Sequence, residues 1–350
     1  MKTVALGMSG GVDSSAAAYL LCEQGVSVIG ITLLLCPGAG AEQAVCDAKR
    51  VAKTLGIPHY VADFRDVFQT QVIDYFCAAY KNGQTPNPCV ACNKHIKFGA
   101  MLDFARELGA DGIATGHYAR VEFDKRGGRY LLKRCAAGLK DQSYALYRLS
   151  QEQLSCALFP LGAYPKDQIR GIAQKIGLEV ANKPDSQEIC FVPDDDYAGY
   201  IEKTTGVHPL EGDFLDTSGN VIGRHRGIIH YTVGQRKGLG MTFGRPMYVV
   251  GIDAAKNAVV LGEAGEQLCR TIYAQDVNYI AVDRLNGPAS LYCKTRYTAN
   301  LEPCVVTPME NGCVKVEREC PKTAAAPGQA VVFYDGDTVV GGATIVQTKP

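Results

Sequence analysis

Short apolar strands alternate with helices along the first third of the chain, and this alternation constrains the fold more than any other feature. Residues 3–8 (TVALGM) and 26–35 (VSVIGITLLL) are continuous apolar runs that predict buried strands. Helical patterns that end at Gly25 and Gly56 follow them. The pattern continues in two further segments, PHYVAD (58–63) and ADGIATGHYA (110–119). We therefore predict an α/β domain with a parallel sheet, helices on both faces, and ligands bound beyond the carboxyl ends of the strands.

The sequence pattern changes after Lys183. A polar loop and a short helix lead into a glycine-rich region from about Gly206. From about Leu268, short alternating segments are joined by turns that contain Asn-Gly and Asp-Gly, which is typical of a small antiparallel β-barrel. A chain of 350 residues is also too long for one ordinary core. We therefore predict a parallel-sheet domain, a small linking domain and a C-terminal barrel, at residues 1–205, 206–267 and 268–350.

The composition is that of a soluble protein. Hydrophobic residues make up 47% of the chain and charged residues 21%. No stretch reaches the roughly 18 apolar residues that a membrane-spanning helix needs, and the early glycines in MKTVALGMSGG argue against a signal peptide. We therefore expect a cytoplasmic protein with no membrane partner.

The chain has 14 cysteines, and the reducing thiol buffers of the cytoplasm are expected to keep them free. In such a compartment, clustered cysteines usually bind metals or take part in catalysis. Most of these cysteines lie singly in apolar segments and are expected to be small buried hydrophobes. Cys89 and Cys92, in TPNPCVACNKHIKF, have a chelating or redox spacing. A complete zinc site needs four ligands, so the pair alone leaves both roles open.

The net charge is formally zero, but basic residues cluster in one segment. Between Thr217 and Gly251 there is no acidic residue, and arginine, lysine and histidine are interleaved with glycine and tyrosine. Such a run is often only a solvated surface. Guanidinium groups beside glycine amides also suit a polyanion, so Arg236 and Lys237 are candidate phosphate contacts.

The segment GMSGGVDSS, Gly7–Ser15, joins the first predicted strand to the first helix. Glycines and serines at this point leave backbone amides and the helix N-terminus available to hold phosphate oxygens. The segment is not a Walker loop, because the Gly-Lys-Ser/Thr that supplies a phosphate-binding lysine is missing. We therefore predict a phosphate site of a different kind.

SGGVDS resembles the pyrophosphatase loop of ATP-dependent adenylating enzymes. In that superfamily the loop holds the departing pyrophosphate while a substrate oxygen attacks the α-phosphate, and AMP becomes the activating group. The resemblance implies that Asp13 helps to place Mg²⁺. It also implies an ATP-binding set made of Gly7, Met8, Ser9, Gly10, Gly11, Val12, Asp13 and Ser14.

Several further segments resemble the bacterial tRNA-specific 2-thiouridylase family. They follow one another along nearly the whole chain: TPNPCVACNKHIKFG (85–99), ATGHYAR (114–120), KDQSYALYRL (140–149), KPDSQEICFVP (183–193), HRGIIHYTVGQRKGLG (225–240) and KTRY (294–297). The resemblance implies an enzyme that binds tRNA and replaces the C2 oxygen of the wobble uridine by sulfur.

This reaction explains why cysteines would be needed. A uracil C2 oxygen is a poor leaving group, so it must be adenylated before a sulfur nucleophile can displace AMP. A cysteine persulfide, filled by a sulfur-donor protein, carries a low-pKa terminal sulfur, and a second cysteine can complete the transfer by forming a disulfide with the first. By motif position, the resemblance implies that Cys92 is the nucleophile and Cys190 the persulfide carrier.

Other residues match family positions that contact the substrates. Leu33 and Gly116 match positions that border the adenine nucleotide. Asn87, Pro88 and Cys89 match the wall around the target base, which must be flipped out of the anticodon loop to expose its C2. The candidate tRNA contacts are His117, Lys140, Asp141, Gln142, Arg296, Tyr297 and Gln329, joined by Arg236 and Lys237 from the acid-free segment.

Cys89 leaves the sulfur chemistry open. Many thiouridylases carry Asp at this position. With a cysteine there, Cys89, Cys92 and Cys190 could instead bind three irons of a [4Fe–4S] cluster and leave the fourth iron open for sulfide. Two other function classes also remain: a small-molecule adenylating synthetase, and a non-catalytic RNA-binding module with zinc at Cys89 and Cys92.

Overall fold

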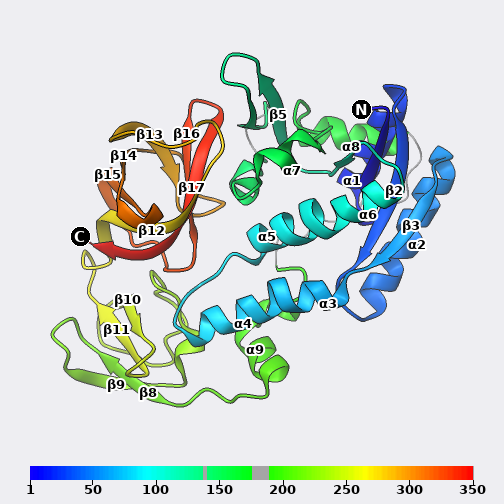
Figure 1. The fold of residues 1–350 in the computed structure, drawn as a ribbon. Coiled ribbons are helices and arrows are strands. Elements are labelled where there is room, and N and C mark those ends of the chain that lie inside the picture. The colour runs from blue at the N-terminus through cyan, green and yellow to red at the C-terminus, as the bar shows by residue number, and fades with distance from the viewer. Residues whose placement is uncertain (137–139, 176–188, 350) are drawn as a thin grey trace.

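The chain folds into three bodies, which Figure 1 shows in a computed structural model that describes residues 1–136, 140–175 and 189–349. A parallel sheet with its helices is followed by a small four-stranded sheet and by a closed antiparallel barrel. The predicted fold class is therefore confirmed.

The parallel sheet has the strand order β3-β2-β1-β4-β7, and each neighbouring pair is parallel. Its strands are β1 (Thr3–Gly7), β2 (Ser27–Leu34), β3 (His59–Asp63), β4 (Gly112–Ala114) and β7 (Ala157–Leu158). Because β1 lies in the middle, the loop that follows it opens at the centre of the carboxyl edge.

Successive residues of β1 point to opposite faces of this sheet, and each face has its own core. Val4 and Leu6 pack with residues of α1 (Val12–Glu23), α2 (Ala39–Leu55) and α8 (Lys166–Lys175). Ala5 packs on the other side with residues of α6 (Met101–Glu107). Strands that are apolar on both faces thus produce the predicted two helical layers.

Two long helical stretches cross from the parallel sheet toward the other bodies (Figure 1). One contains α3 (Arg65–Phe68), the π-helical turn η1 (Gln69–Ile73) and α4 (Asp74–Lys81). The other begins with α5 (Pro88–Ala91) and continues through the π-helical η2 (Cys92–Ala100) into α6. Proline suits the first position of α5, and the Asn87 side chain caps it by accepting from the Val90 amide. Within the described ranges, no helix is long and apolar enough to cross a bilayer.

The small central body contains one helix and a sheet with the order β10-β11-β8-β9. Its elements are α9 (Tyr197–Thr205), β8 (Gly212–Leu215), β9 (Val221–His225), β10 (Tyr248–Asp253) and β11 (Ala258–Gly262), with short 3₁₀ turns η5 (Pro193–Asp195) and η6 (Ile228–His230). Its apolar residues share one core with α4, because Phe76 and Phe214 belong to the same cluster.

The C-terminal strands form a barrel with the order β12-β15-β14-β13-β16-β17, which closes where β12 pairs with β17. They are β12 (Leu268–Tyr279), β13 (Ala289–Lys294), β14 (Glu302–Pro308), β15 (Val314–Thr323), β16 (Ala330–Asp335) and β17 (Thr338–Lys349), with the turn η7 (Glu310–Gly312). Two of its turns use the Asn311-Gly312 and Asp335-Gly336 pairs that predicted them.

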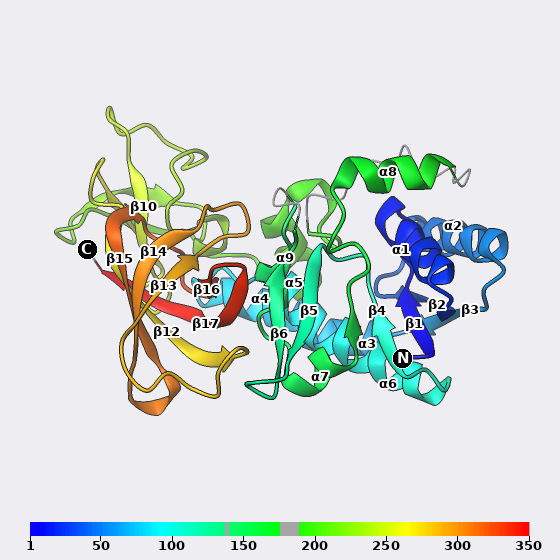
Figure 2. The ribbon, with the colours of Figure 1, turned by 90° about the horizontal axis from the view of Figure 1, so that it is seen from above.

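A hairpin from the first body extends the sheet of the barrel. It consists of β5 (Ala119–Asp124) and β6 (Arg129–Arg134), and Lys133 of β6 pairs with Thr338 of β17. Figure 2 shows this hairpin between the barrel and the parallel sheet. The connecting turn η3 (Ser143–Leu146) and α7 (Gln151–Ser155) follow it, and Tyr144 shares a core with Val332 of the barrel.

Candidate active site

The predicted phosphate loop lies between the end of β1 and the start of α1. Gly10 has a φ of 69°, and a Cβ there would lie 2.7 Å from the Ala44 carbonyl oxygen in α2. Only glycine therefore lets the loop lie against that helix. Since the first amides of a helix have no partner within the helix, the start of the 12-residue α1 offers donors to an anion.

Serine side chains hold the loop in this shape. The Ser14 hydroxyl lies 3.2 Å from the Gly11 carbonyl oxygen and accepts from the Ser9 amide at 3.2 Å. The Ser15 hydroxyl donates to the same Gly11 carbonyl at 2.8 Å. Ser9 is exposed at the tip, whereas Met8, Gly10, Val12 and Ser14 are buried. The Gly7 to Ser14 set thus forms one ordered turn, and its contact with ATP stays a prediction.

Two neighbouring strands bring their ends to the same place. A Cβ on Gly116, after β4, would lie 3.0 Å from both the Asp13 carbonyl carbon and the Ser14 amide nitrogen. Leu33 lies near the end of β2 and is half-buried. The three segments predicted to border the nucleotide therefore meet at the carboxyl edge of the sheet.

Asp13 has two close partners that sequence reasoning missed. Lys166, at the start of α8, places its Nζ 2.6 and 2.7 Å from the two carboxylate oxygens of Asp13. The Tyr118 hydroxyl donates to the same carboxylate at 2.7 Å. Lys166 lies 153 residues from Asp13 in sequence, so no local motif could have indicated the pair.

The cysteines of the predicted sulfur site lie on two segments. Cys89 is exposed in the first turn of α5, and Cys92 is buried at the start of η2. Cys190 is exposed, while the next residue, Phe191, packs into the core that contains Cys92. Residues 183–188 of the segment KPDSQEICFVP lie outside the described residues.

The electrostatics show that these thiols are close enough to influence one another. Burial is the main reason that the pKa of Cys92 is raised to about 12; Lys97 opposes this shift, and Cys190, Cys89 and Cys36 contribute to it. Loss of hydration beside neighbouring protein atoms raises the pKa of the Cys190 thiol, and Cys89 adds to this shift. At neutral pH both thiols are therefore protonated.

Cys36 is a fourth thiol of this group, and sequence reasoning missed it. It lies just beyond β2 and packs against the core that contains Cys92. Burial, with a smaller contribution from Cys190, raises its pKa to about 11. Its position after a parallel strand was the available signal, because that is where ligand-facing residues gather.

The arrangement of these cysteines does not match a metal centre. Among the described residues, no three histidine, cysteine, aspartate or glutamate side chains are grouped closely enough to hold a metal ion. Cys92, with its pKa of about 12, would also have to lose a proton before it could act as a thiolate ligand. The three cysteines as arranged do not fit an iron–sulfur cluster.

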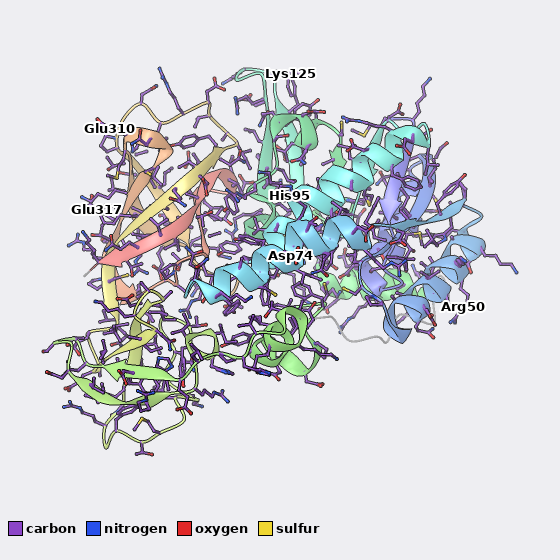
Figure 3. The ribbon with its side chains drawn as sticks, turned by 60° about the horizontal axis from the view of Figure 1, so that its bottom comes forward. Arg50, Asp74, His95, Lys125, Glu310 and Glu317 are labelled. Atoms are coloured by element: carbon purple, nitrogen blue, oxygen red, sulfur yellow. The ribbon has the colours of Figure 1, made fainter. Side chains whose placement is uncertain are left out.

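Asn87 faces a pocket on the other side of the same helix. The pocket has a volume of about 180 Å³, and its lining includes Asn87, Lys94, His95 and Arg148 but neither Cys89 nor Cys92. Figure 3 shows His95 on this helix, beside the one that carries Asp74. Residues three or four apart share a helix face, so the pocket and the cysteine pair occupy different faces. A base held in this pocket would not face the thiols.

Residues of the central body and of the barrel, among them the predicted tRNA contact Gln329, meet residues 85 and 86. The Gln329 side chain donates to the Pro86 carbonyl at 3.4 Å, and the Thr85 hydroxyl donates to that of Thr232 at 3.3 Å. A Cβ on Gly234 would lie 3.0 Å from Nη2 of Arg296. The surface beside the cysteine pair is therefore built from all three bodies.

Some of the predicted tRNA contacts are exposed. Arg236, Lys237, Arg296 and Tyr297 are exposed, and Lys140 is half-buried. Exposed side chains are accessible to a polyanion, and the contact of these residues with tRNA stays a prediction.

Three other candidates are engaged inside the protein. His117 is 9% exposed, pairs with the Thr115 hydroxyl at 2.7 Å and packs near two phenylalanine rings. Asp141 accepts from the Ser143 amide and hydroxyl at 3.2 and 3.0 Å. Gln142 accepts from the Tyr118 amide at 2.9 Å. Their side chains position the loop after β4, and a tRNA contact of these residues stays a prediction.

Comparison with known proteins gives a consistent result along the chain. Family models described as tRNA methyl transferase HUP domain, tRNA methyl transferase PRC-barrel domain and aminomethyltransferase beta-barrel domain match residues 2–194, 199–263 and 269–345. The tRNA-specific 2-thiouridylase MnmA of Acetivibrio thermocellus is 51% identical, over 98% of this chain and 99% of its own length. The proteins of that name from Clostridioides difficile and Heliobacterium modesticaldum are 50% and 52% identical, over 98% and 99% of this chain and 98% and 93% of their own lengths. The chain therefore belongs to the tRNA-specific 2-thiouridylase family.

Proposed function

We propose that this protein catalyses the ATP-dependent 2-thiolation of the wobble uridine of tRNA, with sulfur carried as a persulfide on Cys190. The observation that carries the mechanism is the contrast between an exposed Cys190 and a buried Cys92 whose pKa Cys190 raises. Cys92 shares a core with Cys36, which follows β2, and Cys190 raises the pKa of Cys36; β2 neighbours β1, the strand that leads into the phosphate loop. One edge of the sheet thus holds the parts for activation and for sulfur transfer.

The first step is adenylation of the base. The C2 oxygen of uridine attacks the α-phosphorus of ATP, the bond to the β-phosphate oxygen breaks, and pyrophosphate leaves. The start of α1 and the loop Gly7 to Gly11 supply amides for the phosphate oxygens. Asp13 would hold Mg²⁺, which neutralises phosphate charge when it is bound.

The second step transfers sulfur. The terminal sulfur of the Cys190 persulfide attacks C2, and the C–O bond to AMP breaks. Cys92, after losing its proton, attacks the Cys190 sulfur, which leaves the second sulfur on C2 and forms a Cys92–Cys190 disulfide. An external dithiol then returns two electrons before the next cycle.

The positions of the two thiols suit these different roles. An exposed Cys190 can meet a sulfur-donor protein, whereas a buried Cys92 is protected from solvent oxidants. Because burial raises the pKa of Cys92 to about 12, this thiol is protonated at neutral pH. Premature attack on the persulfide is therefore slow.

The test is a thiolation assay with anaerobically purified protein. Unmodified tRNA, ATP, Mg²⁺ and either sulfide or a cysteine desulfurase with cysteine are incubated, and 2-thiouridine is measured by mass spectrometry of nucleosides. Cys92→Ser and Cys190→Ser should abolish the product, and Cys46→Ser, an exposed cysteine in α2, serves as the control. Iron near four atoms per chain, as a [4Fe–4S] cluster requires, with activity lost on chelation, would exclude the persulfide route.

A further inference from the structure

The phosphate loop has no lysine, although the reaction releases a highly charged leaving group. Asp13 is the one charged side chain in the segment Gly7–Ser15, and by itself its carboxylate would repel a polyphosphate. Pyrophosphate departure also adds negative charge to the β-phosphate oxygens, so a cation near the loop would favour the transition state.

Lys166 brings such a cation to the loop from α8, which packs beside α1. Its ammonium group contacts both oxygens of Asp13, at 2.6 and 2.7 Å, and lies 5.7 Å from the centre of the Tyr118 ring. The side chain of Lys166 is 10% exposed, whereas that of Asp13 is 32% exposed. At the phosphate loop, Asp13 is therefore more accessible to solvent than Lys166.

The backbone around Lys166 also favours a bound anion. Lys166 is the first residue of the ten-residue α8, so its ammonium group and the positive end of the helix dipole lie together. α8 packs along α1, whose own N-terminus forms part of the loop. The N-termini of α1 and α8 and the ammonium group of Lys166 thus lie near the carboxylate of Asp13.

A partly buried ion pair such as this one contributes little net stability, because both groups lose hydration when they come together. A structural explanation for Lys166 is therefore weak. An exchange of Asp13 for the phosphates of ATP gives Lys166 a function, because Asp13 already holds its ammonium group at the loop before ATP binds.

We propose that Lys166 is the phosphate-binding cation of this site, and that it moves from Asp13 to the β- and γ-phosphates when ATP binds. This inference rests on the proposed function. During adenylation the bond between the α-phosphorus and the bridging oxygen breaks, and Lys166 donates hydrogen bonds to the oxygens that gain charge. No proton or electron is transferred to the lysine. The released Asp13 carboxylate is then available to Mg²⁺.

The test uses Lys166→Met, which keeps the length of the side chain and removes its charge, and Lys166→Arg, which keeps the charge. Lys175→Met, at the exposed far end of the same helix, is the matched control. Binding of magnesium pyrophosphate is measured by titration calorimetry, and thiolation by steady-state kinetics. We expect Lys166→Met to weaken pyrophosphate binding at least tenfold and to lower kcat by about 10²–10³-fold, the usual loss when one donor to a developing oxyanion is removed.

The readouts separate this role from a structural one. Lys166→Arg should recover part of both losses, and tRNA affinity should stay at the wild-type value in all variants. Lys166→Met that binds pyrophosphate as tightly as wild type, or that only lowers the melting temperature at unchanged kcat, would overturn the proposal. The titration needs neither tRNA nor sulfur, so it decides the role of Lys166 even if the thiolation assay fails with the wild-type protein.

Discussion

Replacement of Gly116 by alanine tests whether the loop after β4 and the phosphate loop form one site. The φ of Gly116 is not in the left-handed region, so the change adds a methyl group without straining the local backbone. That methyl carbon would lie 3.0 Å from the Asp13 carbonyl carbon and the Ser14 amide nitrogen, and 3.2 Å from the Asp13 Cβ. Ordinary contacts begin near 3.4 Å, so one loop must move by a few tenths of an ångström.

The size of the effect follows from this contact. The neighbouring atoms are mainly backbone at the start of α1, which cannot rotate away as a flexible side chain can. Overpacking of this kind costs about 1–3 kcal/mol. If this free energy is taken up by displacing the phosphate loop, ATP binding should weaken by about 5- to 150-fold, because about 1.4 kcal/mol corresponds to a factor of ten in affinity.

The assay is the KM for ATP in tRNA thiolation, together with titration of a non-hydrolysable ATP analogue. Gly171→Ala is the control, because Gly171 lies inside α8 and a Cβ there would meet open space. Alanine should stabilise that helix by about 0.5–1 kcal/mol and leave the KM for ATP unchanged. An unchanged KM for ATP in Gly116→Ala would refute the reasoning.

Four further outcomes are expected. Asp13→Ala should abolish ATP-dependent thiolation and leave tRNA affinity nearly intact, as measured by filter binding; an equal loss of tRNA affinity would contradict that division. Replacing Arg236 and Lys237 by alanine should lower the log–log salt slope of tRNA binding by roughly 0.7–0.9 per lost phosphate contact, and an unchanged slope would leave these residues as solvated surface. Cys89→Asp should keep partial activity if a persulfide carries the sulfur, because a carboxylate can still position the base; loss of activity together with bound iron would favour the cluster, for which a carboxylate is a poorer ligand. Burial lowers the pKa of His117 well below 6.5, so below pH 6.5 the unfolded chain binds a proton that the folded chain does not. The free energy of unfolding should therefore fall as the solution is acidified below pH 6.5, and denaturant titrations should show a smaller fall in His117→Gln.

The parallel sheet could be predicted because its strands are buried on both faces. The apolar run at residues 26–35 became β2, Ser27–Leu34, and the glycine-rich turn after residues 3–8 became the loop before α1. Local sequence fixes both features, since burial selects the strand and glycine permits the positive φ of Gly10. The Asn-Gly and Asp-Gly turns of the barrel were predictable for the same reason.

Contacts between distant segments were not predictable. Lys166 is an ordinary lysine at the start of a helix until α8 packs against α1. Asp141 matches a tRNA-contacting position, but its carboxylate is engaged by Ser143 in a buried turn. Side-chain burial of this kind depends on tertiary packing, which neither spacing nor periodicity records.

The hairpin β5–β6 also affects how the protein is made. Lys133 in β6 pairs with Thr338 in β17, a separation of 205 residues. At a synthesis rate of about 5–20 residues per second, a ribosome needs roughly 10–40 s to add the intervening chain. During that interval the edge of β6 has no partner strand, and Leu132, which is fully buried in the finished fold, lacks the barrel residues that share its core. An unpaired strand edge invites pairing with other chains, so the nascent first body should be the stage at which this protein is most prone to aggregate and most in need of a chaperone.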